Sequence, residues 1–362
     1  MLNNIVGIEM RMATDDDVHL PTYDNTKLLN INTCPTWGII RYSKHLRMPR
    51  PGREMALEAG SAAHEGFAAI RWMQLHQRQS DTKIKKQIAE NTGVKLFGED
   101  RFAKMLGTLS NDATERTNTI NFALESVYTS GFYDDPTDRN RSVSNISESL
   151  IAYVDRYDMD RYPIWIRDST DPNSDVGIEI AFDIVIKFII QEAKELLGIT
   201  CDRSFRFTGK LDGLHYDKEH LTIIEEKTAS GLSDAWLSQW IMSNQITGYC
   251  MAASTFTGLD CTRAIVSGTR LPIGKIPAEG IRKEPVRRNQ SMFADWSRWF
   301  LSTVDVERTY INEVVKAPKY THSCSRYFRT CSFLPFCAAR DDEEKERILG
   351  EMEHDEWSPL DE

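Results

Sequence analysis

Residues 207–228 read FTGKLDGLHYDKEHLTIIEEKT, with two strand-like segments on either side of a short polar turn. If residues 218 and 219 form a two-residue loop, the antiparallel register sets Asp212 opposite Glu225. Directly paired residues project to the same face of a hairpin, and Lys227 shares the face of Glu225 because strand side chains alternate. The stretch therefore predicts a hairpin on which Asp212, Glu225 and Lys227 converge.

The chemistry of this trio suits a divalent cation and a phosphate. Two carboxylates a few ångströms apart are hard oxygen ligands of the kind that bind Mg2+ or Mn2+. A neighbouring ammonium stabilises a metal-bound hydroxide or the charge that develops on a phosphate. Glu226 alternates to the opposite face, so only its backbone carbonyl could join the same cation. The alternative is a surface hairpin with a cross-strand ion network, although the apolar run Leu221–Ile224 sets these charges at the end of a buried strand, where unpaired ions are unfavourable.

The segments around the hairpin predict an α/β fold with a mixed central sheet flanked by helices. β-branched and alternating patterns predict strands over residues 177–190, 205–216, 221–230 and 262–269. Apolar residues at helical spacing predict helices over residues 53–78, 233–253 and 284–315. Residues 80–165 are polar with helical patches, which favours a mainly helical insertion or arm outside the core.

Charge is unevenly distributed along the 362 residues, whose formal net charge is −10. Eleven carboxylates against Lys345 and Arg347 give residues 341–362 a net charge of −9, which leaves −1 for residues 1–340. Basic side chains gather in residues 41–53 and again in residues 262–288. Both runs are candidate phosphate-contacting surfaces, with ordinary solvated faces as the alternative, because affinity for a polyanion depends on local rather than total charge. Residues 341–362 are predicted to form an acidic tail that competes with a polyanion.

Three of the seven cysteines lie in one short stretch, Cys324-x6-Cys331-x5-Cys337. Residues 1–14 lack a secretory signal pattern and no segment is apolar enough to span a membrane, so a reducing, cytoplasmic location is expected. Clustered thiolates in that setting favour a metal or iron–sulfur site over a structural thiol cluster. Cys34 is the candidate fourth ligand. His322 is the alternative and would complete a zinc set, although paired C-x2-4-C zinc knuckles are absent.

Six elements in chain order resemble the PD-(D/E)XK nuclease superfamily, in particular its RecB-like branch with an iron–sulfur cluster. That branch includes AddB-type helicase–nucleases, the iron–sulfur exonuclease of CRISPR adaptation and phage exonucleases. The elements are an early cysteine, G-x3-H, a strand aspartate, E-x-K, Q-x3-Y and three late cysteines, here Cys34, Gly60 with His64, Asp212, Glu225 with Lys227, Gln245 with Tyr249, and Cys324, Cys331 and Cys337. The resemblance implies a restriction-endonuclease-like core within residues 1–340.

The resemblance also implies a role for each matching residue. Asp212, Glu225 and Lys227 would be catalytic. The divalent-metal ligands would be His64, Asp212, Glu225, the Glu226 carbonyl and Glu179, which matches an acidic residue of an earlier strand. Cys34, Cys324, Cys331 and Cys337 would hold a 4Fe–4S cluster that staples the chain ends together, with zinc as the alternative metal. Substrate would contact Gln245, Tyr249, Arg47, Arg50 and Arg53.

The sequence departs from the family pattern at two places. The usual late cysteine spacing is C-x2-C-x5-C, whereas the first interval here is x6. The third catalytic position is E-E-K in place of the common D-x-K, and glutamate supplies the same oxygen chemistry.

The function implied by the resemblance is Mg2+- or Mn2+-dependent hydrolysis of DNA, most simply by an exonuclease of recombination, repair or phage DNA processing. Alternatives are a structure-specific endonuclease or CRISPR spacer-processing nuclease and, in another class, a non-catalytic iron–sulfur DNA-binding subunit. DNA is the expected partner, together with an unidentified helicase or recombination protein, in the cytoplasm of a bacterial, archaeal or phage-infected cell.

Overall fold

The structure is a computed structural model that describes residues 8–49, 54–157, 162–189, 203–271, 280–326 and 329–358. The chain divides into two compact units. Unit 1 comprises Met1–Leu2, Arg53–Phe182 and Lys210–Asn289, and unit 2 comprises Asn3–Gly52, Asp183–Gly209 and Gln290–Glu362. In the part of the chain that the structure describes, none of the helices has the length and apolar character needed to cross a membrane.

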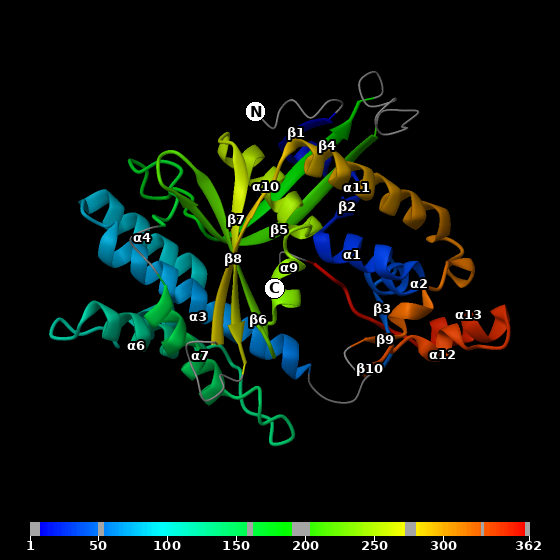
Figure 1. Cartoon of the computed structure of the whole chain (residues 1–362), viewed down its shortest axis with the longest axis horizontal. Coiled ribbons are helices and arrows are strands. Elements are labelled where there is room, and N and C mark those ends of the chain that lie inside the picture. The colour runs from blue at the N-terminus through cyan, green and yellow to red at the C-terminus, as the bar shows by residue number, and fades with distance from the viewer. Residues whose placement is uncertain are drawn as a thin grey trace. The chain divides into compact units, whose positions relative to one another are not determined.

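The sheet of unit 1 is mixed, as predicted. Its strands are β4 (Ile178–Phe188) and β5 (Arg203–Tyr216), both of which continue into unit 2, with β6 (Leu221–Ala229), β7 (Cys261–Arg270) and β8 (Ile281–Arg287). β6 pairs antiparallel with β5 and parallel with β7, and β7 pairs antiparallel with β8. The parallel pair needs a crossover connection, which helix α10 (Asn244–Thr257) supplies (Figure 1).

The β5–β6 hairpin has the predicted register. Gly213 pairs with Ile224 and Tyr216 pairs with Leu221, which leaves residues 218 and 219 as the loop. Lys218 adopts a positive φ of 77°, as tight hairpin turns require. The paired register ends at Gly213, so Asp212, the residue that precedes it in the sequence, lies just beyond the last pair. There the Glu226 amide donates to Asp212 Oδ2 at 2.7 Å, so the Asp212 carboxylate replaces a backbone partner at the point where the predicted catalytic residues begin.

The first helices of unit 1 pack into one core, coloured blue to green in Figure 1. They are α3 (Met55–Arg78), α4 (Lys83–Phe97), α5 (Glu99–Leu106), α6 (Glu115–Tyr128) and α7 (Val143–Arg156). α3 contacts β6, and α7 contacts β7 and β8. Trp72 of α3 stacks on Phe122 of α6 and meets Phe102 of α5 edge-on. Residues 80–165 therefore contribute to the hydrophobic core, unlike the separate arm expected from their polar composition, because few but large apolar side chains face α3.

Two of the predicted helices differ from the structure. Residues 233–253 form a short helix α9 (Asp234–Ser238) and then α10, with a turn between them, because backbone carbonyls of that turn accept from Arg288. The segment 284–315 begins as strand β8 and becomes helical only at α11 (Gln290–Tyr310). Pro285 fits this strand because β8 lies at the end of the strand order, where a missing amide donor is tolerated.

Unit 2 surrounds an aromatic cluster. Strand β1 (Ile8–Met12) pairs with β4, and β2 (Thr22–Tyr23) pairs with β5. Phe300 of α11 packs against Tyr23, Phe188 and Phe205. Helix α1 (Asn25–Thr33) begins at the N-cap Asp24, whose carboxylate accepts from the Lys27 amide.

The end of the chain folds back within unit 2. A small hydrophobic core in unit 2 includes Ile31, Ile39, Phe333, Phe336 and Ile348. Three helices contribute side chains to it or pack against it, namely α2 (Pro35–Gly38), α12 (Leu334–Cys337) and α13 (Asp342–Gly350). Strand β11 (Glu353–His354) then pairs with β3 (Leu46–Arg47). Residues 341–358 are thus a packed segment with an acidic surface rather than a free tail.

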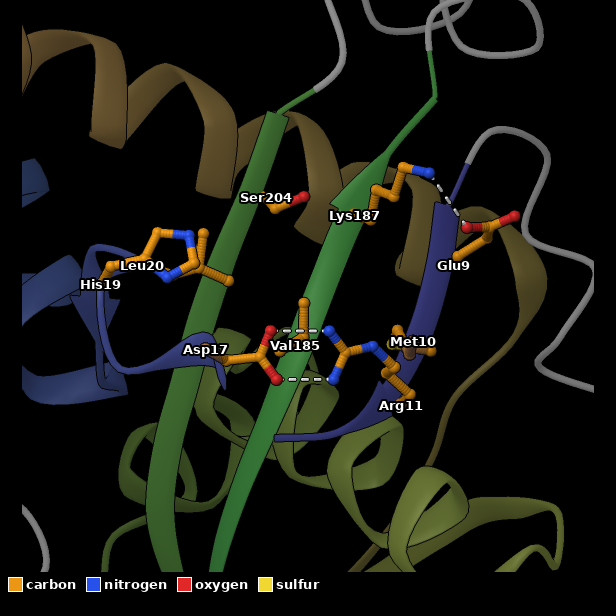
Figure 2. Close-up of a pocket in the computed structure, with 9 residues that line it drawn as sticks. All are labelled: Glu9, Met10, Arg11, Asp17, His19, Leu20, Val185, Lys187 and Ser204. Atoms are coloured by element: carbon orange, nitrogen blue, oxygen red, sulfur yellow. Dashed lines mark hydrogen bonds and ion pairs between the residues drawn. The ribbon is translucent and has the colours of Figure 1, made fainter. Parts of the chain in front are cut away.

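A cavity of about 520 Å3 in unit 2 is lined by charged residues that pair with one another. Figure 2 shows the guanidinium of Arg11 against the carboxylate of Asp17, and Lys187 beside Glu9 at 3.5 Å. None of the residues predicted to be functional lines this cavity.

Buried His215 makes the stability of the protein depend on pH. Its ring is enclosed beside the Tyr157 hydroxyl, 3.4 Å from Nε2, and the Tyr162 carbonyl, and burial together with the nearby Arg71 charge lowers the pKa of His215 to about 3. The unfolded chain binds a proton near pH 6.5, so the contribution is full above that pH and is lost as pH falls toward 3. Between pH 7.5 and pH 5 we expect His215 to lower the free energy of unfolding by about 2 kcal/mol.

Urea unfolding in EDTA at both pH values measures this effect. The loss of stability on acidification should be about 2 kcal/mol smaller in His215→Gln than in the wild type. An equal loss in both proteins would show that His215 is not the responsible group.

Candidate metal centre

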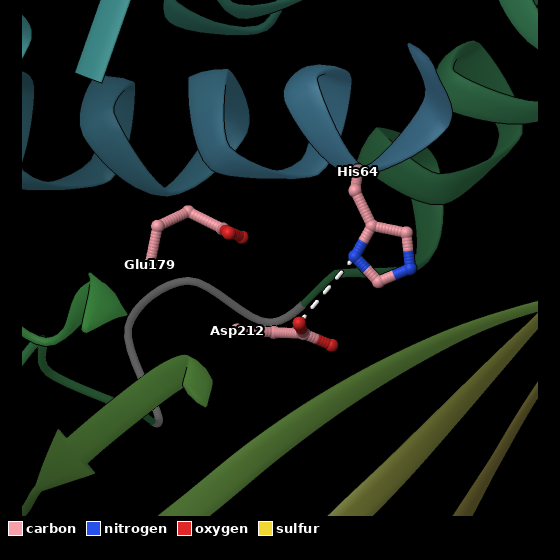
Figure 3. A group of neighbouring side chains, drawn as sticks. All are labelled: His64, Glu179 and Asp212. Carbon is pink, nitrogen blue, oxygen red and sulfur yellow. Dashed lines mark ion pairs between the residues drawn. The ribbon is translucent and has the colours of Figure 1, made fainter. Parts of the chain in front are cut away.

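Three ligand groups from three elements of unit 1 meet in one cluster. His64 comes from α3, Glu179 from β4 and Asp212 from β5, and one ligand atom of each lies within 4.8 Å of the others. His64 Nδ1 is 3.4 Å from Asp212 Oδ1. Figure 3 shows the His64 ring and the two carboxylates turned toward a common space below α3. The structure thus brings together three of the predicted metal ligands that are far apart in sequence.

Glu179 reaches this cluster through an unusual backbone conformation. It has φ of 49° within strand β4, a left-handed value that is uncommon for a residue with a side chain. Such local strain persists only where the surroundings enforce it, and it gathers at functional sites. Glu179 Oε2 lies 3.2 Å from Lys210 Nζ, whereas Oε1 is buried and has no hydrogen-bond partner in the described part of the chain.

The E-x-K residues of β6 interact with α10. Glu225 is almost fully buried, and its Oε1 lies 2.6 Å from Lys227 Nζ and 2.9 Å from Gln245 Nε2. Gln245 Nε2 is also 3.2 Å from the Tyr249 hydroxyl. The Q-x3-Y pair therefore orients the carboxylate of Glu225, while the Lys227 side chain stays partly exposed.

Glu226 points to the opposite side of β6, as alternation predicts. Its carboxylate is fully buried, forms an ion pair with Arg71 of α3 and accepts from the Tyr153 hydroxyl of α7. Arg71 also donates to the backbone carbonyl of Asp212 at 2.9 Å. The side chain of Glu226 is thus engaged in contacts with α3 and α7.

Arg71 is the main residue of this region that sequence reasoning missed. It lies seven residues after His64, on an otherwise apolar stretch of α3, and is 1% exposed. A charged residue on the buried face of a helix was the available signal, because such a residue requires a buried partner.

The charges of the centre perturb one another strongly. Burial and the Asp212 charge raise the pKa of Glu225 to about 7, partly offset by Lys227. Burial and Asp212 likewise raise the pKa of Glu179. Burial alone would raise the pKa of Asp212 and lower that of His64, but their mutual attraction reverses both, so the pKa of Asp212 is lowered and that of His64 raised. A bound cation would relieve this crowding of carboxylates.

The donor set fits a divalent cation. Asp212 and Glu179 supply oxygens and His64 an imidazole nitrogen within one cluster. Glu179 Oε1 and Glu225 Oε2 are buried and lack a hydrogen-bond partner among the described residues. Unsatisfied buried carboxylate oxygens are unfavourable without a positive charge nearby. Mg2+ and Mn2+ both accept such oxygens, and Mn2+ also accepts imidazole.

The four predicted cluster cysteines lie near one another in unit 2. Burial raises the pKa of Cys337 to about 11, and the sulfurs of Cys34, Cys331 and Cys324 are close enough to add to that shift, while Lys319 opposes it. The Cys331 amide donates to the Cys324 carbonyl at 2.8 Å. None of the four forms a disulfide in the described part of the chain.

The predicted basic surfaces have different surroundings. Arg47 is half-exposed and pairs with Glu353 at 3.2 Å, and Arg50 and Arg53 lie outside the described residues. In the second run, Arg288 is buried and Lys283 lies over the ring of Tyr157 at 4.7 Å. Among the described residues of this run, Arg288 is therefore not part of an exposed basic surface, whereas Arg287 is exposed.

Comparisons with known proteins place the chain in a family. The sequence profile of the PD-(D/E)XK nuclease superfamily matches residues 26–338. Among solved structures, the chain is similar to "Crystal structure of SSO0001", with 15% identity, a TM-score of 0.24 and coverage of 38% of this chain and 54% of that chain, about half its length. No curated protein matches the chain. Because the superfamily profile covers most of the 362 residues and encloses the whole carboxylate, histidine and lysine centre, the chain belongs to the PD-(D/E)XK nuclease superfamily.

Proposed function

We propose that the protein is a Mg2+- or Mn2+-dependent DNA nuclease that degrades DNA from an end. The observation that carries the proposal is the convergence of His64, Glu179 and Asp212 beside the Glu225–Lys227 pair. The superfamily supports a metal-dependent nuclease. The preference for exonuclease action rests on the resemblance to the RecB-like branch.

The residues of the centre have two roles in the proposed phosphodiester hydrolysis, which are to bind the cation and to stabilise negative charge. His64, Asp212, Glu179, Glu225 and the Glu226 carbonyl would hold the cation. When bound, a divalent cation neutralises the phosphate and lowers the pKa of water. Lys227 stabilises negative charge on the attacking or phosphoryl oxygen, and its ammonium is already oriented by Glu225.

Gln245 and Tyr249 of helix α10 support the position of Glu225, the carboxylate that pairs with Lys227. Gln245 holds the Glu225 carboxylate through a direct hydrogen bond, and Tyr249 contacts Gln245 from the next turn of α10. Both residues are thereby suited to support the site and to approach the DNA backbone.

The test is a cleavage assay with the metal omitted or added. End-labelled linear single strands, linear duplexes and circular single strands are incubated with the full chain. Degradation of the linear substrates alone, dependent on Mg2+ or Mn2+, supports an exonuclease. Cleavage of the circles would favour a structure-specific endonuclease instead, because an exonuclease has no end from which to start. DNA binding without cleavage under either metal would favour a non-catalytic subunit.

We also propose that Cys34, Cys324, Cys331 and Cys337 hold a 4Fe–4S cluster. The four cysteines lie near one another in unit 2, and clustered thiolates are the ligands that iron–sulfur clusters use. The preference for iron–sulfur over zinc rests on the resemblance to the RecB-like branch.

Purification without oxygen tests the cluster. We expect a brown protein that absorbs at about 400 nm and contains about four iron and four sulfide per chain, as a 4Fe–4S cluster held by four thiolates requires. Cys331→Ser should lose the colour, whereas Cys250→Ser, at a buried cysteine outside the set, should keep it. Colourless protein with stoichiometric zinc would contradict the assignment.

The basic run 41–53 is proposed to hold DNA phosphates, and the C-terminal segment occupies part of it. Arg41 lies 2.7 Å from Asp355, and Arg47 pairs with Glu353 and Asp355. The Asp355 amide donates to the His45 carbonyl at 2.7 Å. The carboxylates of residues 353–355 are thus placed to compete with phosphate for Arg41 and Arg47.

Neutralising Glu353 and Asp355 should strengthen DNA binding at low salt. We expect Glu353→Gln with Asp355→Asn to lower the Kd about threefold to tenfold at low ionic strength, with little change at high ionic strength. Fluorescence anisotropy with labelled DNA measures this effect. The matched control, Glu343→Gln with Glu346→Gln, changes the same net charge on exposed positions of α13. These variants are preferable to deleting residues 341–362, which would remove Ile348 and Met352 from the core. Equal effects in both double variants would contradict local competition.

A further inference from the structure

Two tryptophans of unit 1 lie beside the lysine of the metal centre. In the parallel β6–β7 register Lys227 pairs with Gly268, and a Cβ at Gly268 would overlap the indole of Trp236. The glycine therefore allows the ring of Trp236 to lie against the sheet next to Lys227. Trp240 follows one turn later, with its ring centroid 5.5 Å from that of Trp236 and 6.0 Å from Lys227 Nζ.

The turn after Trp240 exposes two large apolar side chains. Ile241 is 47% exposed and Met242 is 64% exposed, immediately before the helix that carries Gln245. We call Trp236, Trp240, Ile241 and Met242 the aromatic lip. An apolar surface beside a polar centre usually marks a place where a ligand binds.

The backbone of the lip is held in one conformation. Buried Arg288 donates to the carbonyls of Trp240, Ile241 and Ser243 at 3.0–3.1 Å. Its Nε also donates to the Thr247 hydroxyl at 2.8 Å. These hydrogen bonds from Arg288 hold the backbone of the turn in one conformation. The backbone therefore does not need to be ordered when a ligand binds to the apolar side chains.

We propose that the aromatic lip stacks on unpaired nucleobases of the strand that enters the centre, so the preferred substrate is single-stranded DNA or a frayed end. This inference rests on the nuclease function proposed above. Unpaired bases expose flat apolar faces, which stack on indole rings and pack against apolar side chains. Bases within a duplex are already stacked on their neighbours and offer such a lip only their edges. The adjacency of the lip to Lys227 favours the substrate itself as the occupant over another protein.

Binding measured in EDTA tests the lip without turnover. Fluorescence anisotropy compares a labelled single strand with a blunt duplex of the same sequence. We expect Ile241→Ser with Met242→Ser to weaken single-strand binding about fivefold or more and to change duplex binding less than about twofold. The control is Ile84→Ser with Val94→Ser, two exposed apolar residues of α4, which should alter neither affinity.

A second readout reports stacking itself. The fluorescence of 2-aminopurine in the single strand should fall on binding to the wild type, and this quenching should be smaller for Trp236→Leu. Equal weakening of single-strand and duplex binding, or no weakening of either, would overturn the proposal, and the latter result would assign the lip to a partner other than DNA. Failure of the wild type to bind or cleave any DNA would instead refute the nuclease function.

Discussion

Lys227→Ala is expected to lower the rate of DNA cleavage by about 10²- to 10³-fold, the usual effect of removing one group that stabilises transition-state charge. The ammonium lies 2.6 Å from Glu225, and the lysine side chain is partly exposed. The fold should persist because the lysine side chain is not part of the apolar core and the Glu225 carboxylate keeps its hydrogen bond from Gln245. The effect should fall on kcat, with DNA affinity nearly unchanged, since the lysine acts on charge that appears during the reaction.

Asp212→Asn provides an independent test of the same centre. It keeps the size of the side chain and an oxygen that accepts from the Glu226 amide, but removes the charge that attracts both His64 and a cation. We expect activity to fall at least as far as in Lys227→Ala, together with weaker Mn2+ binding measured by calorimetry.

Lys95→Ala is the matched control for the lysine, because Lys95 is 80% exposed in the same unit. Activity should remain close to that of the wild type. Full cleavage activity in both Lys227→Ala and Asp212→Asn would remove the basis for placing catalysis here.

Arg71→Met is expected to destabilise the protein by about 3–5 kcal/mol. The substitution leaves the fully buried Glu226 carboxylate without its guanidinium partner, and uncompensated buried charges are among the most destabilising changes. It also removes the hydrogen bond to the Asp212 carbonyl. Urea unfolding at neutral pH measures the loss.

A double-mutant cycle separates the ion pair from simple packing. Glu226→Gln alone should also be destabilising, whereas the combination with Arg71→Met should lose less than the sum of the single variants, because no unpaired charge remains. Arg78→Met is the control on the same helix, where a partly exposed pair with Glu115 should contribute about 1 kcal/mol or less. Comparable losses in Arg71→Met and Arg78→Met would show that burial of the pair does not govern stability.

The part of the site that is local in sequence was predictable. Hairpin register follows from loop length and alternation, and the predicted register of β5 and β6 is confirmed from Tyr216 as far as Gly213. The same register predicts that Asp212, Glu225 and Lys227 share one face. The opposite direction of Glu226 followed from the same alternation. The order of strands and helices also followed from apolar periodicity in most segments.

The remaining features depend on contacts between distant segments. The left-handed backbone of Glu179 has no signature in its neighbours. The break between α9 and α10 is determined by Arg288, more than thirty residues further along the chain. The packing of α4–α7 on α3 depends on a few aromatic residues that a polar composition conceals.

The end of the β5–β6 pairing at Gly213 has a consequence for the folding of the centre. A hairpin that closes from its turn forms the rungs nearest residues 218 and 219 first and the segment of Asp212 and Glu225 last. The Glu226 amide is protected by the Asp212 carboxylate and not by a strand partner on β5. Its hydrogen exchange is therefore expected to follow the placement of the Asp212 carboxylate, so a single backbone proton reports whether the proposed catalytic group is in position.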